Sequence, residues 1–72
     1  MMMKFTKLSE NSSKIIYKIF DGLFGTVEYD KATKSVFFFD ESGKEYEDRL
    51  EKAAFYQVIQ AGFPDEYVYA AG

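Results

Sequence analysis

Hydrophobic and polar residues alternate in the first half of the chain, and one stretch of the second half follows a helical period. Three segments are rich in β-branched and aromatic residues, which is typical of strands: KIIYKIF (14–20), GTVEYD (25–30) and SVFFFD (35–40). Asp21-Gly22 and the polar segment that begins at Asp30 separate them and have the composition of turns. The pattern therefore predicts three consecutive strands that pair antiparallel.

The length of the second turn decides which side chains share a face. If Asp30 pairs with Ser35, Tyr29 lies opposite Val36, and a turn one residue shorter or longer would reverse the third strand. One face then carries Ile15, Tyr17, Ile19, Val27, Tyr29, Val36 and Phe38. The other face carries Ile16, Lys18, Phe20, Thr26, Glu28, Phe37 and Phe39.

A helical pattern runs from Glu45 to Ala61, and Gly62 follows where a left-handed cap residue belongs. Its apolar positions are Leu50, Ala54, Phe55, Val58, Ile59 and Ala61, and its polar stripe is Arg49, Lys52, Tyr56 and Gln60. The sequence leaves two start positions for this helix open. Ser42-x-x-Glu45 has the form of a capping box, which favours a start near Glu45. Asp48-x-x-Glu51 has a similar form and would leave residues 44–47 as a short fourth strand. We favour the earlier start.

The two ends carry weaker patterns. Residues 1–13 are polar except for Phe5 and Leu8, beyond the initial methionines, and are interpreted as a loose N-terminal arm. Residues 62–72 are interpreted as a tail, in which Pro64 and the two acids after it resemble the first turn of a helix.

The elements together predict a single small α+β domain over residues 1–72. Its strands occupy residues 14–40, and its amphipathic helix occupies residues 45–61. The fold is a three-stranded antiparallel sheet, with a short fourth strand as an open alternative. The helix packs on one face of the sheet, and a short C-terminal helix or tail follows it.

Composition excludes several classes of function. The 72 residues contain no cysteine and no histidine, so disulfides, thiolate metal sites and the usual general base are all missing. There is no glycine-rich phosphate loop and no nucleophile–base signature. We therefore expect no enzyme activity, no cofactor and no metal site, unless the chain supplies part of a shared active site.

Aromatic residues are the main functional signal. Eight Phe and six Tyr are more than so small a core can bury, so several must lie on a surface. We expect a non-enzymatic protein–protein interaction module whose partner is a second copy or another protein. The candidate partner-binding residues are Phe20, Phe37, Phe39, Tyr56, Tyr67 and Tyr69. The alternative is that the arm covers the outer sheet face through Phe5 and Leu8, or that the aromatics serve stability alone.

Charge supports two further alternatives. The net charge is −3, with acids concentrated in residues 40–51, so the chain could be an acidic inhibitor that occupies a nucleic-acid-binding groove of another protein. Phe37 and Phe39 could instead stack on single-stranded nucleic acid, although the only lysines available near them are Lys14, Lys18, Lys31 and Lys34, too few for a basic face. No segment resembles a transmembrane helix or a signal peptide, so we expect a cytoplasmic location and no membrane partner.

Overall fold

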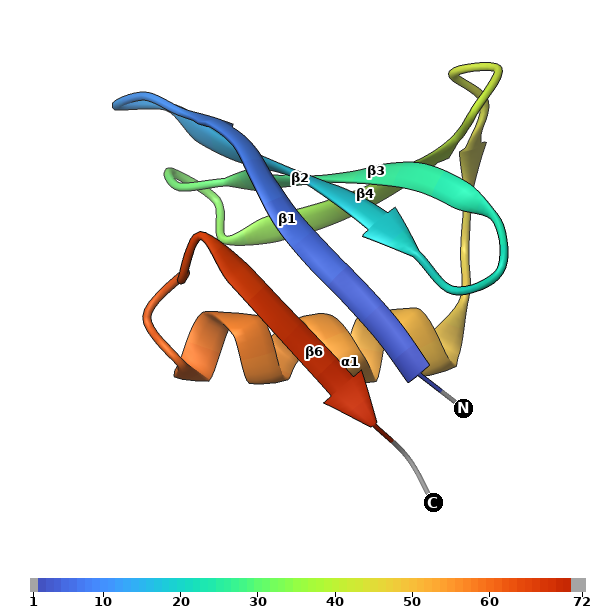
Figure 1. The fold of residues 1–72 in the computed structure, drawn as a ribbon. Coiled ribbons are helices and arrows are strands. Elements are labelled where there is room, and N and C mark those ends of the chain that lie inside the picture. The colour runs from blue at the N-terminus through green and yellow to red at the C-terminus, as the bar shows by residue number, and fades with distance from the viewer. Residues whose placement is uncertain (1, 71–72) are drawn as a thin grey trace.

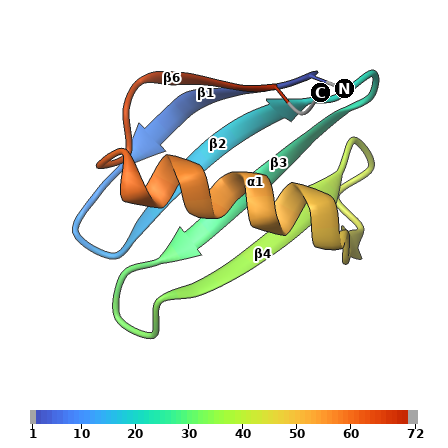
Figure 2. The same cartoon turned by 90° about the horizontal axis from the view of Figure 1, so that it is seen from below.

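The structure, a computed structural model that describes residues 2–70, combines an antiparallel sheet of six strands with one helix that lies across a single face of the sheet (Figures 1 and 2). The elements are β1 (Met2–Glu10), β2 (Lys14–Phe20), β3 (Phe24–Asp30), β4 (Ser35–Asp40), β5 (Glu45–Tyr46), α1 (Arg49–Gln60) and β6 (Glu66–Ala70). Their order across the sheet is β5-β4-β3-β2-β1-β6.

The three central strands confirm the register that the turn length predicts. Asp30 pairs with Ser35, and Tyr29 pairs with Val36. The Asp30 carboxylate accepts hydrogen bonds from the backbone N–H groups of Ala32 and Thr33, which fixes the four-residue turn. Phe37 and Phe39 consequently lie on the face that is turned away from the helix.

The predicted three-stranded sheet is wrong, because residues 2–10 and 66–70 are also strands, while residues 71–72 of the predicted tail lie outside the described residues. Residues 2–10 form β1, which pairs with β2, and not a loose arm. Phe5 from β1 is fully buried on the helix side, so the arm does not cover the outer face. The tail is not a helix either: its residues from Glu66 to Ala70 form β6, which pairs with β1. Each end supplies the partner that the other needs.

The helix begins four residues later than the predicted start at residue 45. Asp48 is the N-cap, and its carboxylate accepts hydrogen bonds from the N–H groups of Leu50 and Glu51. Glu45 and Tyr46 form the short strand β5, the alternative that was open. An Asp N-cap competes well with Ser, and Ser42 instead donates its hydroxyl to Asp40 in the β4–β5 turn.

The C-terminal end of the helix confirms the predicted cap. Gly62 has a φ of 84°, and its N–H donates to the carbonyl of Ile59. The N–H of Phe63 donates to the carbonyl of Val58, which completes a Schellman motif. The ring of Phe63 packs against Tyr29 with a centroid distance of 4.9 Å. This cap reverses the chain and directs it towards β6.

The core lies between the sheet and the helix. Its buried hydrophobic residues are Met3, Phe5, Ile15, Tyr17, Ile19, Val27, Phe38, Ala54, Phe55 and Val58. Phe55 is at its centre, with its ring packed against those of Phe5, Tyr17 and Phe38. Three positions differ from the predicted wheel, since Leu50 and Ala61 are exposed and Glu51 is buried.

Candidate interaction surface

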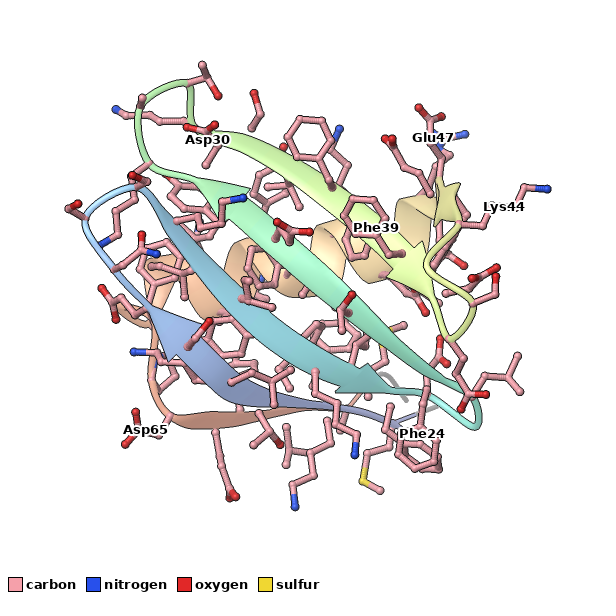
Figure 3. The ribbon with its side chains drawn as sticks, turned by 90° about the horizontal axis from the view of Figure 1, so that it is seen from above. Phe24, Asp30, Phe39, Lys44, Glu47 and Asp65 are labelled. Carbon is pink, nitrogen blue, oxygen red and sulfur yellow. The ribbon has the colours of Figure 1, made fainter. Side chains whose placement is uncertain are left out.

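The sheet face away from the helix carries large aromatic side chains with no covering element in residues 2–70 (Figure 3). We call this the outer face and define it by Lys4, Thr6, Ile16, Lys18, Phe20, Phe24, Thr26, Glu28, Phe37, Phe39 and Val68. The strand register places these residues in rows that cross the sheet. One row runs from Phe24 to Phe20 to Lys4, and the next runs from Phe39 through Thr26 to Lys18.

An aromatic pair occupies one corner of the outer face. The rings of Phe20 and Phe24 lie opposite each other on β2 and β3, with centroids 4.7 Å apart. The ammonium of Lys18 lies 4.5 Å from the centroid of the Phe24 ring, a cation–π contact. With Lys4 and Thr6, these three residues line a shallow hollow of about 240 Å³. The two rings remain 41% and 45% exposed, although a folded chain usually hides such large apolar groups.

Sequence reasoning missed Phe24. It treated the residues before Gly25 as turn, whereas the turn ends at Leu23 and β3 begins with Phe24. The register of the strands contained the signal. If Ile19 pairs with Gly25, then Phe24 pairs with Phe20, and both side chains point to the outer face.

Phe37 and Phe39 form the second aromatic group, on β4. Phe37 is 39% exposed, and Phe39 is half-buried beside Thr26. Glu28 lies beside Phe37 in the same row, on the side away from Phe20 and Phe24, and it accepts a hydrogen bond from Lys14 at 3.3 Å. The outer face therefore carries aromatic rings together with side chains of both charges.

The tyrosines among the predicted site residues do not join this surface. Tyr56 lies on the solvent side of the helix, where it is exposed. Tyr67 and Tyr69 point from β6 towards the helix side and pack partly buried against the core. The structure thus brings together Phe20, Phe37 and Phe39 on one face, and it places the three tyrosines elsewhere.

A second, acidic hollow lies at the end of the sheet beside the start of the helix. It has a volume of about 270 Å³ and is lined by Asp21, Leu23, Phe24, Asp40, Tyr46, Asp48 and Glu51. The Tyr46 hydroxyl donates to Glu51 at 2.5 Å, and Glu51 is only 4% exposed. Burial, with the neighbouring carboxylate of Asp21, raises the pKa of Glu51 to about 7. Burial also raises the pKa of Tyr46.

Local structure accounts for three of the acids in residues 40–51. Asp48 caps the helix, and Glu51 bonds to Tyr46. The Asp40 carboxylate accepts hydrogen bonds from the Ser42 hydroxyl and from the backbone N–H groups of Ser42 and Lys44. These hydrogen bonds lower the pKa of Asp40. No group of three acidic side chains within residues 2–70 is arranged to hold a metal ion.

Comparisons with known proteins add no identification: no family model, no curated protein and no solved structure matched the chain. Along the described part of the chain, the one helix is too short and too polar to cross a membrane. The site must therefore be interpreted from its own chemistry.

Proposed function

We propose that the protein is a non-enzymatic interaction module that binds a protein partner, either another protein or a second copy, through the outer face. The observation that carries this proposal is the exposure of Phe20, Phe24 and Phe37 on an uncovered sheet face. Large exposed apolar groups that gather on one face and are rimmed by polar side chains mark interaction sites.

The charges of the outer face favour a protein surface over a polyanion. Lys4 and Lys18 are accompanied by Glu28 on the same face, so the surface is not uniformly basic. Two of the lysines that nucleic acid would need already have acidic partners, because Lys14 bonds to Glu28 and Lys31 bonds to Glu10 at 3.0 Å. Burial of aromatic rings with a mixed polar rim is the pattern of protein–protein interfaces.

The acidic-inhibitor alternative has less support. A mimic of nucleic acid needs carboxylates that project freely from the surface, whereas Asp40, Asp48 and Glu51 are engaged in a turn, a cap and a buried contact. Salt separates the two functions. An acidic mimic loses affinity steeply as the salt concentration rises, and aromatic burial does not.

Site-specific photocrosslinking in the cells that produce the protein tests the proposal. A benzophenone amino acid replaces Phe39 in one variant and Tyr56 in a matched control, which places the same probe on the outer face or on the exposed side of the helix. We expect discrete adducts from position 39 that persist at high salt and are absent from position 56. Adducts of equal yield from both positions, or none from position 39, would refute the proposal.

A further inference from the structure

We propose that β6 is a self-association edge, at which two copies of the chain pair their β6 strands antiparallel about Val68 and continue the sheet from one copy into the other. This inference is separate from the proposed function, because it uses the backbone edge of the sheet and leaves the aromatic side chains of the outer face free. It is drawn from the exposure of the strand, the direction of its backbone groups and its sequence.

The outer side of β6 is open. β6 is the last strand in the sheet order, and no strand of residues 2–70 pairs with its free side (Figure 2). Free edges normally carry charged side chains (above all Lys), a Pro or a bulge, which block further pairing. β6 reads Glu-Tyr-Val-Tyr-Ala and pairs with β1 in an unbroken register, so its one charge lies at its first residue and it has no Lys, Pro or bulge. The opposite edge is protected by its shortness, because β5 has two residues.

The pairing with β1 fixes which backbone groups of β6 are free. The N–H of Lys7 donates to the carbonyl of Asp65 at 2.8 Å, so these two residues form a hydrogen-bonded pair. Antiparallel pairs alternate, which makes Tyr67 and Tyr69 the next residues bonded to β1. The backbone N–H and C=O groups of Glu66, Val68 and Ala70 consequently point outward. Val68, at the middle of the strand, is also 53% exposed.

The sequence of β6 is complementary to itself when it is reversed. With Val68 opposite Val68 of a second copy, Tyr67 lies opposite Tyr69 of that copy. This aromatic pair forms twice, once on each side of Val68. Glu66 lies opposite Ala70 of the second copy, so no like charges face each other. All three outward-pointing residues then fall in hydrogen-bonded pairs, which uses every free backbone group of the strand. Aromatic cross-strand pairs and opposed neutral residues both favour this register.

The segment that leads into the strand is also anchored. The carbonyl of Pro64, two residues before β6, accepts a hydrogen bond from the buried Tyr17 hydroxyl. Because β6 is already a strand before association, less conformational entropy is lost when a second copy pairs with it than if it were unstructured.

Sedimentation equilibrium from micromolar to millimolar concentration tests the proposal, with a dimer of twice the 8.3 kDa chain as the expected result. Val68→Pro removes the central outward N–H, which β1 does not use, so we expect a folded monomer. Val68→Thr is the matched control and should remain dimeric. Amide exchange at the three outward-pointing residues should slow as the concentration rises, whereas the amides of Tyr67 and Tyr69 should be protected throughout.

Substitutions at Ala70 test the register. This residue faces Met2 within its own sheet and Glu66 of the second copy in the proposed dimer. Ala70→Lys should tighten the dimer and Ala70→Glu should weaken it, each by about 2- to 30-fold for the two pairs formed. Equal effects of the two substitutions would overturn the register.

Three results would overturn the edge dimer. They are a monomer at every concentration, a dimer that Val68→Pro leaves intact, and a dimer that Phe39→Ser dissolves. The last of these would instead support self-association through the outer face. Conversely, an edge dimer whose position 39 gives no photocrosslink would remove the proposed function and leave the edge inference standing.

Discussion

The buried hydroxyl of Tyr17 donates a hydrogen bond to the backbone carbonyl of Pro64 at 2.5 Å. Tyr17 belongs to a central strand and is fully buried against Phe55, and Pro64 lies in the segment between the helix and β6. Burial raises the pKa of Tyr17 to about 12, so the hydroxyl keeps its proton at ordinary pH. This single bond ties the middle of the sheet to the chain that leads into its edge.

Removal of that hydroxyl should weaken the attachment of β6. We expect Tyr17→Phe to lower the free energy of unfolding by about 1–2 kcal/mol, because the Pro64 carbonyl loses its donor while the ring packing is kept. Urea unfolding followed by tyrosine fluorescence or circular dichroism measures the change. Tyr56→Phe removes an exposed hydroxyl from the helix and is the control, and an equal loss in both variants would contradict the assignment.

Glu51 should make stability depend on pH in an unusual direction. Its pKa is raised in the folded state, from an ordinary 4.5 to about 7, so the folded protein favours the protonated form. The stabilising contribution is complete below about pH 4.5 and is lost as the pH rises towards 7. Glu51→Gln retains an acceptor for Tyr46 and does not titrate. We expect it to be more stable than the native chain at pH 8 by about 1–3 kcal/mol and nearly equal near pH 4.5.

Urea titrations of the native chain and of Glu51→Gln across this pH range measure the difference between their free energies of unfolding. The other carboxyl groups contribute equally to both chains, so their contributions cancel in this difference. The titratable side chains around Glu51 are Tyr46, Asp21 and Asp48, which come from β5, the β2–β3 turn and the N-cap. A difference between the two chains that stays constant with pH would contradict the raised pKa.

The two possible capping boxes predict different mutational effects. Asp48→Ala removes the carboxylate that accepts from Leu50 and Glu51, and we expect a loss of about 1 kcal/mol of stability. Ser42→Ala lies in an exposed turn outside the helix and should cost less than about 0.5 kcal/mol. Thermal melts of the pair decide between them, since a larger loss from Ser42→Ala would place the helix start back near residue 45.

Gly25 permits a close approach between two strands. A Cβ atom at this position would lie 2.8 Å from the backbone carbonyl oxygen of Phe39, which cannot move without displacing β4. We expect Gly25→Ala to cost about 1–3 kcal/mol through this overlap. Chemical denaturation measures the loss, and an unchanged midpoint would show that the strands separate without cost.

Local pattern was sufficient for the centre of the sheet. The alternation in KIIYKIF and SVFFFD predicts which side chains share a face. With the four-residue polar turn between β3 and β4, it also predicts the pairing of Tyr29 with Val36 and the outward position of Phe39. Here both neighbours of each strand are close in the sequence, so the turn alone sets the register. The cap at Gly62 was equally local and equally predictable.

The outer strands could not be found in the same way, because their partners are distant. Met3 and Phe5 alternate with Lys4 and Thr6, which is a strand pattern, but it is only two periods long and is broken by a bulge before Ser9. Pro64 and the acids after it imitate a helix start, which hid the alternation in β6. Only the pairing of β1 with β6, across almost the whole chain, makes either segment a strand.

The candidate site was predictable to the same extent. The faces of Phe20, Phe37 and Phe39 followed from register, whereas the tyrosines were grouped with them by residue type alone. Tyr67 and Tyr69 face the helix side because β6 joins the sheet, which no local pattern revealed. Glu51 did not stand out among the acids of residues 40–51, because its hydrogen-bond partner, Tyr46, lies on a strand that a helix start near Glu45 excludes.

The pairing of β1 with β6 also sets an order of assembly. Each of the other strand pairs joins neighbours in the sequence and needs only a short loop to close, whereas this pair must bring together segments more than fifty residues apart. Closing so long a loop costs more entropy, and we expect β6 to dock last and to detach first. Until β6 docks, β1 is the edge of an incomplete sheet, and the backbone groups on that side of β1 have no partner strand.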